Sequence, residues 1–138
     1  MCILSVPLAL LVVSSPMPNI LPLCDVIRRT SFSIHEYLRG GHLERVYENA
    51  LVHRLRKQGI NVQQQLPIDI FDEDGTRLGH YVADLLIETE LIVELKACET
   101  LTLEHMAQLF GYLRGAQLRH GLLINFGPRR LQLRKLVF

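Results

Sequence analysis

Three charged residues stand inside two apolar runs in the middle of the sequence. Asp84 interrupts the run at 82–87, and Glu94 and Lys96 interrupt the run at 91–97. Runs this apolar are typical of central, buried strands, where an unpaired charge is costly. Carboxylates held on a rigid sheet are hard oxygen ligands, which suit Mg²⁺ or Mn²⁺. The pattern therefore points to a metal site on two neighbouring strands.

The short segment between the two runs predicts which residues face each other, because a three-residue loop pairs Ile87 with Leu91. Continued along both strands, this register sets Asp84 directly opposite Glu94 on one face. Lys96 lies two residues beyond Glu94 and therefore on the same face. Facing carboxylates repel each other unless a cation lies between them, which favours a metal site. The alternative is that Lys96 forms ion pairs with both acids at a partly solvated edge.

Two further groups of polar residues are candidates for the same site. His105, Gln108 and Tyr112 lie at i, i+3 and i+7, which places them in one stripe along a helix. The alternative for this stripe is a polar edge beside the apolar face of that helix. Glu44 is the other candidate, and taken alone it is explained as an acid in the first turn of a helix, stabilised by the helix dipole.

Apolar residues at three- and four-residue spacing predict the helices that carry these candidates. The first covers about 25–38 and ends at Gly40-Gly41, a pair that can adopt the left-handed backbone of a helix stop. The second covers about 43–57, with Gly59 as its stop. A third follows Thr102, whose side chain can cap it.

Between residues 62 and 97 the apolar pattern changes to that of strands. The expected strands are at 62–70, 81–87 and 91–97, and after the third helix at 121–126 and 131–137. The order of elements is then α-α-β-β-β-α-β-β. This order predicts an α/β fold with a mixed central β-sheet flanked by helices.

Length, charge and cysteine content narrow the class of protein. With 138 residues the chain is long enough for one domain with its own core, and too short for two full domains. Its 15 Lys and Arg against 14 Asp and Glu give a formal net charge of +1, so a nucleic-acid surface must be local. The three scattered cysteines support neither a disulfide framework nor a cysteine zinc site, and no apolar stretch is long enough to span a bilayer. We therefore expect a reducing compartment, the cytoplasm, and no membrane.

Residues 1–24 differ from the rest of the sequence. They contain four of the six prolines and an apolar run from Ile3 to Val13. The prolines exclude one continuous helix, and no Lys or Arg precedes the apolar run as it would in a secretory signal. We expect an N-terminal arm or a start site upstream of the true domain, with a signal peptide as the less favoured alternative. The domain itself is then expected at residues 25–138.

A series of short motifs resembles one protein family in order and spacing. Residues 41–51 read G-H-L-E-R-V-Y-E-N-A-L and match the pattern that names the GxxExxY family. The other matching segments are Ala83–Leu86, Ile92–Ala97, Ala107–Leu113 and Gly121–Gly127. The GxxExxY family is placed in the PD-(D/E)XK nuclease superfamily, and the resemblance covers about 25–138. It implies a restriction-endonuclease-like core, with a helix, three strands, a helix and a further strand.

The charged residues of these motifs are similar to those of the RecB-like branch of that superfamily. The resemblance implies that Asp84, Glu94 and the Leu95 carbonyl bind one or two Mg²⁺ or Mn²⁺ ions. Glu44 would approach the same site from its helix. Lys96 would orient or deprotonate the attacking water and offset charge on the transition state. A phosphodiester is an anion that resists an anionic nucleophile, so activation of water and neutralisation of the phosphoryl oxygens must occur together.

Contact with DNA needs further polar and basic residues. The resemblance implies that Gln108 and Tyr112 support the site or hold a DNA phosphate. Positive charge is offered by Arg114, Arg119, His120, Arg129, Arg130, Arg134 and Lys135. Such residues could bind phosphates, and the alternative is that they form an ordinary solvated surface. Because no base-reading motif is visible, backbone geometry, a junction, an end or a single strand is the expected feature of the substrate.

Two classes of function follow from the sequence. The first is a metal-dependent nuclease that hydrolyses phosphodiester bonds, with DNA as its expected partner. The second is a noncatalytic nucleic-acid-binding or protein-interaction module on the same fold. A homodimer or a larger repair or defence assembly is a further expectation. Binding of a divalent metal ion distinguishes the two classes, because only the nuclease requires it.

Overall fold

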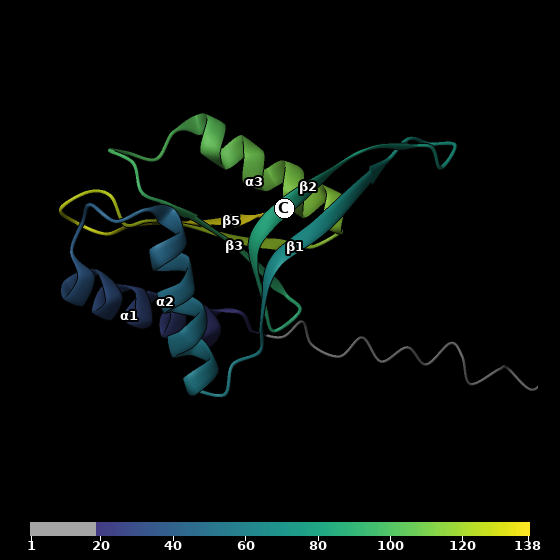
Figure 1. The fold of residues 1–138 in the computed structure, drawn as a ribbon. Coiled ribbons are helices and arrows are strands. Elements are labelled where there is room, and N and C mark those ends of the chain that lie inside the picture. The colour runs from purple at the N-terminus through teal and green to yellow at the C-terminus, as the bar shows by residue number, and fades with distance from the viewer. Residues whose placement is uncertain (1–18) are drawn as a thin grey trace, which may run out of the picture.

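The computed structural model describes residues 19–138, which form three helices and one five-stranded sheet (Figure 1). The elements in chain order are α1 (Leu21–Leu38), α2 (Glu44–Lys57), β1 (Val62–Phe71), β2 (Arg77–Ile87), β3 (Leu91–Lys96), α3 (Leu103–Ala116), β4 (His120–Asn125) and β5 (Gln132–Val137). The predicted order of elements is confirmed. Residues 1–18, which make up most of the predicted N-terminal arm at 1–24, lie outside the described residues.

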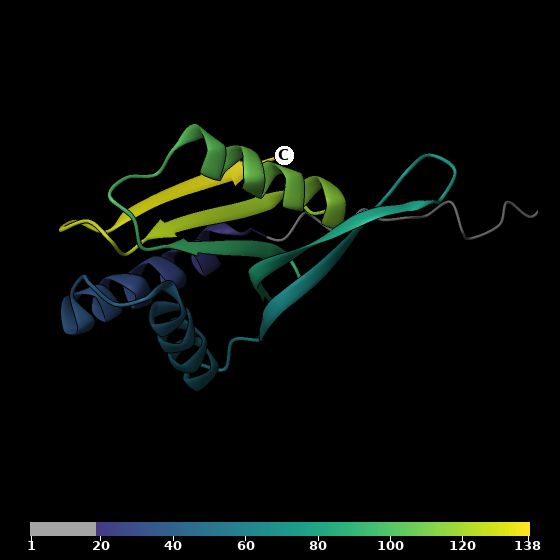
Figure 2. The ribbon, with the colours of Figure 1, turned by 45° about the horizontal axis from the view of Figure 1, so that its top comes forward.

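The sheet separates two apolar cores, with α1 and α2 on one face and α3 on the other (Figures 1 and 2). Its strand order is β1-β2-β3-β4-β5, and only β3 and β4 run parallel, joined by the α3 crossover. Within β3, Leu91, Val93 and Leu95 pack on the side of α1 and α2, whereas Ile92 packs against α3. Because successive residues of a strand point to opposite faces, Glu94 lies on the α3 face. This mixed sheet confirms the α/β class and fits a restriction-endonuclease-like core.

Helix α1 begins at Leu21, four residues before the predicted start at residue 25. Pro22 lies in its first turn, where a proline is tolerated because the backbone N–H that it lacks has no partner within the helix. Ile20, just before the helix, is buried in the core. Within residues 19–138 no helix combines the length and the apolar character that a membrane crossing needs.

At one position along β1 and β2, the side chains of both strands change from one face of the sheet to the other. Val62 on β1 and Leu85 on β2 belong to the core beside α1 and α2. Leu66 and Ala83 lie four and two residues away on the same strands, yet they pack in the core beside α3. An even separation keeps two residues on one face of a regular strand, so both strands must change direction between these positions.

The exchange occurs where Gln65 and Asp84 face each other. Backbone pairing joins Gln64 to Leu85 and Leu66 to Ala83, whereas the level between them has no pair. Gln65 has a φ of 59°, in the left-handed region that a residue with a side chain rarely adopts. This bend redirects the side chains of both strands at the level of Asp84.

Beyond the bend, β1 and β2 continue as a hairpin that projects from the sheet (Figures 1 and 2). We call residues 67–82 the arm. All side chains from 71 to 82 are exposed. The predicted turn at Asp72–Gly75 is confirmed at its tip, where Asp72 donates its N–H to Thr76 O over 2.8 Å. Strand β2 begins at Arg77, earlier than the predicted residue 81, because neither face of this part is buried and no apolar alternation marks it.

Candidate active site

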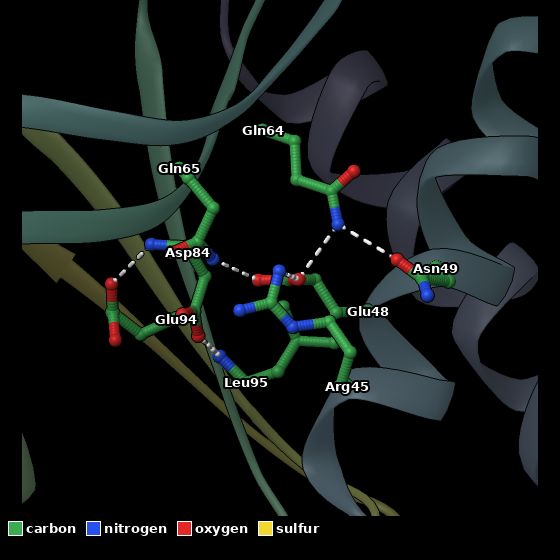
Figure 3. Close-up of polar contacts among 8 residues, drawn as sticks. All are labelled: Arg45, Glu48, Asn49, Gln64, Gln65, Asp84, Glu94 and Leu95. Atoms are coloured by element: carbon green, nitrogen blue, oxygen red, sulfur yellow. Dashed lines mark hydrogen bonds and ion pairs between the residues drawn. The ribbon is translucent and has the colours of Figure 1, made fainter.

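The carboxylates of Asp84 and Glu94 each accept a hydrogen bond from a backbone N–H of the other residue's strand (Figure 3). The backbone N–H of Asp84 donates to Glu94 Oε1 over 2.7 Å, and that of Leu95 donates to Asp84 Oδ2 over 2.9 Å. Regular pairing of β2 with β3 ends just before this point, at Leu85 opposite Val93. The two carboxylates therefore accept N–H groups at the place where the strands separate.

The register predicted for β2 and β3 is confirmed, with Ile87 opposite Leu91, and it brings Asp84 and Glu94 together. The directions of the two side chains differ from the expected single face. Asp84 faces a cavity beside α2, whereas Glu94 points away from α2 (Figure 3) and lies on the face toward α3. The cause is the bend in β2, which turns the side chain of Asp84 away from regular alternation.

A cavity of about 540 Å³ lies between the start of α2, the part of β2 around Asp84 and the C-terminal end of β3. Its acidic lining residues are Glu44, Glu48 and Asp84, and Leu95 also reaches it. The structure thus brings Glu44, in the first turn of α2, to the cavity that Asp84 faces. Arg45 is a basic residue in the same lining.

Glu48 was not among the predicted site residues, although it is the best-anchored acid of this cavity. Only 3% of its surface is exposed. Gln64 Nε2 donates to its Oε2 and Gln65 Nε2 to its Oε1, both over 2.7 Å, and Arg45 Nη1 lies 3.0 Å from Oε2 (Figure 3). One signal could have identified it, because Glu48 follows Glu44 by four residues and therefore shares its helix face.

Burial raises the pKa of three acids at this site. The pKa of Glu94 rises to about 8, first through burial and next through the nearby charge of Asp84. Burial also raises the pKa of Asp84, against the N–H bond from Leu95, and the pKa of Glu48. The raised pKa values mean that the surrounding protein does not fully stabilise the ionised forms of these three acids. A cation would favour their ionised forms.

Lys96 ends β3 and is half-buried beside the acidic pair. Its charge lowers the pKa of both Asp84 and Glu94, though less than burial raises them. Among residues 19–138, no ion pair within 4.0 Å joins Lys96 to either acid. The alternative interpretation, an edge held together by these ion pairs, is therefore not observed in the described part of the chain.

The polar stripe on α3 divides into residues with different roles. Tyr112 is buried, and after burial itself the charges of Glu94 and Asp84 raise its pKa, so its hydroxyl lies close to the acidic pair. Gln108 is exposed one turn earlier. His105 instead caps the helix, because its Nδ1 accepts the N–H of Thr102 over 3.1 Å while Thr102 Oγ1 accepts the N–H of His105.

The glycine and tyrosine of the G-x-x-E-x-x-Y motif shape the loop that leads into α2. Tyr47 is fully buried and stacks on Phe126 with ring centroids 4.7 Å apart. Its hydroxyl donates to Arg39 O over 2.6 Å and accepts the N–H of His42. Gly41 has a φ of 95°, which favours glycine. These residues hold the start of α2, and with it the glutamate of the motif, at the cavity.

The acids present fit a magnesium-like ion held jointly by protein and substrate. Within the described residues, no three His, Cys, Asp or Glu side chains are grouped to hold a metal ion unaided. Mg²⁺ is commonly bound through one or two carboxylates, with waters and substrate phosphates as its other ligands. Asp84 and Glu94 supply two such carboxylates at one level of neighbouring strands, Asp84 toward the cavity and Glu94 toward α3, with raised pKa values that a cation would relieve.

Comparison with known proteins places these residues in context. Residues 22–136 match the model of the PD-(D/E)XK nuclease superfamily. The chain is similar to the crystal structure of SSO0001, with a TM-score of 0.56 and 19% sequence identity. That similarity covers 67% of this chain and 49% of the other, so this chain spans about half the length of SSO0001. At this identity it shows the fold alone. No curated protein matches the sequence.

Proposed function

Because the chain belongs to the PD-(D/E)XK nuclease superfamily, we propose that it is a metal-dependent nuclease that hydrolyses phosphodiester bonds of DNA. The observation that carries this proposal is the exchange of hydrogen bonds between Asp84 and Glu94 where β2 and β3 separate. It puts the half-buried Asp84 at the wall of an open cavity, bonded through its backbone N–H to the buried Glu94, with Lys96 next to both acids. The motif pattern further supports the GxxExxY family and the RecB-like branch.

We assign the metal ligands to the residues around this exchange. Asp84, Glu94 and the Leu95 carbonyl would hold Mg²⁺ or Mn²⁺, and Glu44 would approach from α2. When bound, such an ion supplies a water of lowered pKa and offsets charge on the phosphoryl oxygens. Glu48 is held by Gln64, Gln65 and Arg45, so it would add negative potential to the cavity from a defined position.

The remaining residues would act on the water and on the phosphate. Lys96 carries a positive charge beside two carboxylates, so it can orient the attacking water and balance charge that develops on the phosphate. The hydroxyl of Tyr112 would orient Glu94 or donate to a phosphate oxygen. Gln108, exposed one turn away on α3, would contact the DNA backbone.

The test is cleavage of labelled single-stranded, duplex and branched DNA with Mg²⁺, with Mn²⁺ and with EDTA. Glu94→Ala should lose metal binding and cleavage together, because it removes a ligand. Lys96→Ala should bind metal in calorimetry with wild-type affinity and lose most of its cleavage. Lys57→Ala removes the same charge from the exposed end of α2 and is the matched control. Wild-type cleavage by Lys96→Ala would contradict the mechanism.

One observation favours a second candidate function, a noncatalytic module that binds nucleic acid or protein. Both carboxylates already accept backbone N–H groups, and a pKa of about 8 leaves Glu94 largely protonated at neutral pH without an ion. Such a site can be stable with no metal at all. Absence of metal binding in calorimetry, together with absence of cleavage, would favour this module. For either function we propose the cytoplasm as location, and a homodimer or a larger repair or defence assembly as context.

A further inference from the structure

A second cavity, of about 450 Å³, lies between the arm and α3. Two aromatic rings of the arm line it, those of Phe71 and Tyr81, together with Gly111 and Arg114 of α3. The exposed fractions are 57% for Phe71 and 48% for Tyr81. Two aromatic rings are thus exposed beside one cavity, and apolar groups that gather at one place on a surface can mark a binding site.

Tyr112 links one ring of this lining to the candidate active site. The rings of Tyr81 and Tyr112 lie against each other, with centroids 5.4 Å apart and planes inclined by 40°. Tyr112 in turn lies close enough to Glu94 for that charge to act on its hydroxyl. A chain that passes the acidic pair could therefore continue over Tyr112 and Tyr81 onto the arm.

Gly111 has no role in packing that explains its presence inside a helix. A glycine in the interior of a helix destabilises it relative to alanine. A Cβ added at Gly111 would meet no atom within 4 Å, so a side chain would fit there. At Gly115, one turn later, an added Cβ would lie 2.5 Å from Ile70 and 2.9 Å from Ile68. Gly115 is thus needed for packing α3 on β1, whereas Gly111 keeps the cavity open.

The charges of the lining favour an anionic ligand. Asp69, the acid of the lining, lies 3.0 Å from Arg77 of the arm. Arg114 has no carboxylate partner within 4.0 Å among residues 19–138. Its guanidinium lies over the Phe138 ring, 5.4 Å from the centroid, which leaves its N–H groups available. The lining therefore combines flat apolar rings with a cation that can bind a phosphate.

We propose that this cavity binds an unpaired base of a single-stranded nucleic acid, with an adjacent phosphate on Arg114. Every base has a flat face that stacks on aromatic side chains, and a base within a duplex has that face covered by its neighbours. Phe71 and Tyr81 supply the stacking surface, and Gly111 leaves room for the base. This inference rests on the proposed nuclease function and deepens it, because it selects single strands as the substrate.

The test measures binding in EDTA, where no metal-dependent cleavage can occur. The probes are a labelled oligothymidylate, an abasic strand with the same number of phosphates, and a duplex of the same length. Wild type should bind oligothymidylate at least about fivefold more tightly than the abasic strand, the lower end expected for one stacked base. Equal binding of the two strands would overturn the proposal, because phosphates alone would then account for the affinity.

Two variants locate the effect. Phe71→Ala should remove most of the preference for oligothymidylate over the abasic strand. Phe32→Ala, at another exposed phenylalanine, on α1, is the matched control and should keep that preference. Gly111→Leu should weaken binding of oligothymidylate at least about fivefold by filling the cavity. Because the helix gains from losing a glycine, its melting temperature should equal or exceed that of wild type. Unchanged binding by both Phe71→Ala and Gly111→Leu would also overturn the proposal.

The two proposals can fail separately. If wild type cleaves no nucleic acid with Mg²⁺ or Mn²⁺, yet prefers oligothymidylate in a manner that Phe71→Ala abolishes, the base site stands and the nuclease falls. If wild type cleaves DNA while binding all strands equally, the nuclease stands and the base site falls.

Discussion

Glu94 retains a proton in the folded protein that it would release in the unfolded chain at neutral pH. Its pKa rises from 4.5 to about 8, because burial and the neighbouring Asp84 disfavour its charge. Between these two values the folded state binds more protons than the unfolded state. The free energy of unfolding therefore decreases as the pH rises from about 4.5 to about 8. Burial raises the pKa of Asp84 and of Glu48, so both change stability in the same direction.

This linkage predicts a pH-dependent melting temperature in metal-free protein. In EDTA, wild type should melt at a higher temperature at pH 5.5 than at pH 8.5. Glu94→Gln cannot ionise and should show a smaller decrease over the same interval. Thermal unfolding followed by circular dichroism checks this, with His53→Gln, an exposed residue on α2, as the control. A decrease in Glu94→Gln as large as in wild type would assign the effect to other groups.

The glutamines on β1 fix the position of Glu48, and this also can be tested at a single residue. Gln65→Met keeps the length of the side chain and removes the donor to Glu48 Oε1. Loss of one bond to a buried carboxylate should cost about 1–3 kcal/mol in the free energy of unfolding, measured with urea. The control is Gln63→Met, an exposed neighbour that should change little. An equal cost at both positions would mean that the bond to Glu48 contributes nothing.

At the scale of elements, the loop before α2 determines where the site's helix begins. Tyr47→Phe keeps the ring that stacks on Phe126 and removes the hydroxyl that bonds to Arg39 and His42. We expect a loss of about 1 kcal/mol in the free energy of unfolding. Cleavage should fall as well, because Glu44 follows directly on this loop. Tyr37→Phe, at a ring that is 77% exposed, is the control, and an equal effect there would contradict the proposed role of the loop.

The elements could be predicted from the sequence where one face is buried and the periodicity is strong. That condition holds for α2 and α3, whereas β3, buried on both faces, was predicted from an almost continuous apolar run, and the register at Ile87 and Leu91 followed from a short loop. The early start of α1 and the length of the arm could not be predicted, because Pro22 suggests a break and residues 71–82 of the arm have no buried face to impose alternation.

The bend in β1 and β2 at Gln65 and Asp84 could not be predicted, for a different reason. A glutamine seldom adopts a positive φ, so nothing in the type of Gln65 announces the change of face. The meeting of Asp84 with Glu94 could be derived from register, whereas the direction of Asp84 depends on this bend. The spacing of four residues from Glu44 could have placed Glu48 at the site, whereas its anchoring by glutamines of β1 is a contact between segments that local spacing does not reveal.

At the scale of the whole molecule, the protein joins a sheet buried on both faces to an arm whose outer part, residues 71–82, is exposed (Figure 2). Five of the six residues of β4 are buried, and β3 beside it has five as well. The side chains of the arm from 71 to 82 are all exposed. Local stability should therefore differ greatly between the two parts.

Hydrogen exchange of the free protein should show this difference. Backbone amides near the tip, about residues 72–80, should exchange first, and those of β3 and β4 last, because exposed hairpins open without disrupting the core. Mass spectrometry of peptides after exchange measures both regions in one experiment, with β3 as the internal reference. Slow exchange across the tip would contradict an exposed arm and would indicate that a second copy of the chain covers it.

The simultaneous change of face in β1 and β2 has a consequence for insertions and deletions. Between Asp72 and Thr76 an inserted residue alters only a solvent-exposed tip. Between Gln64 and Leu66 the same insertion would turn every following side chain of β1 by one position, so that the residues packed against α3 would point outward. In a library with one codon inserted at each site, surviving clones should therefore accumulate at the tip and be absent at the bend. The length of β1 is therefore constrained at the bend, where the strand passes from one core to the other, and unconstrained at the solvent-exposed tip.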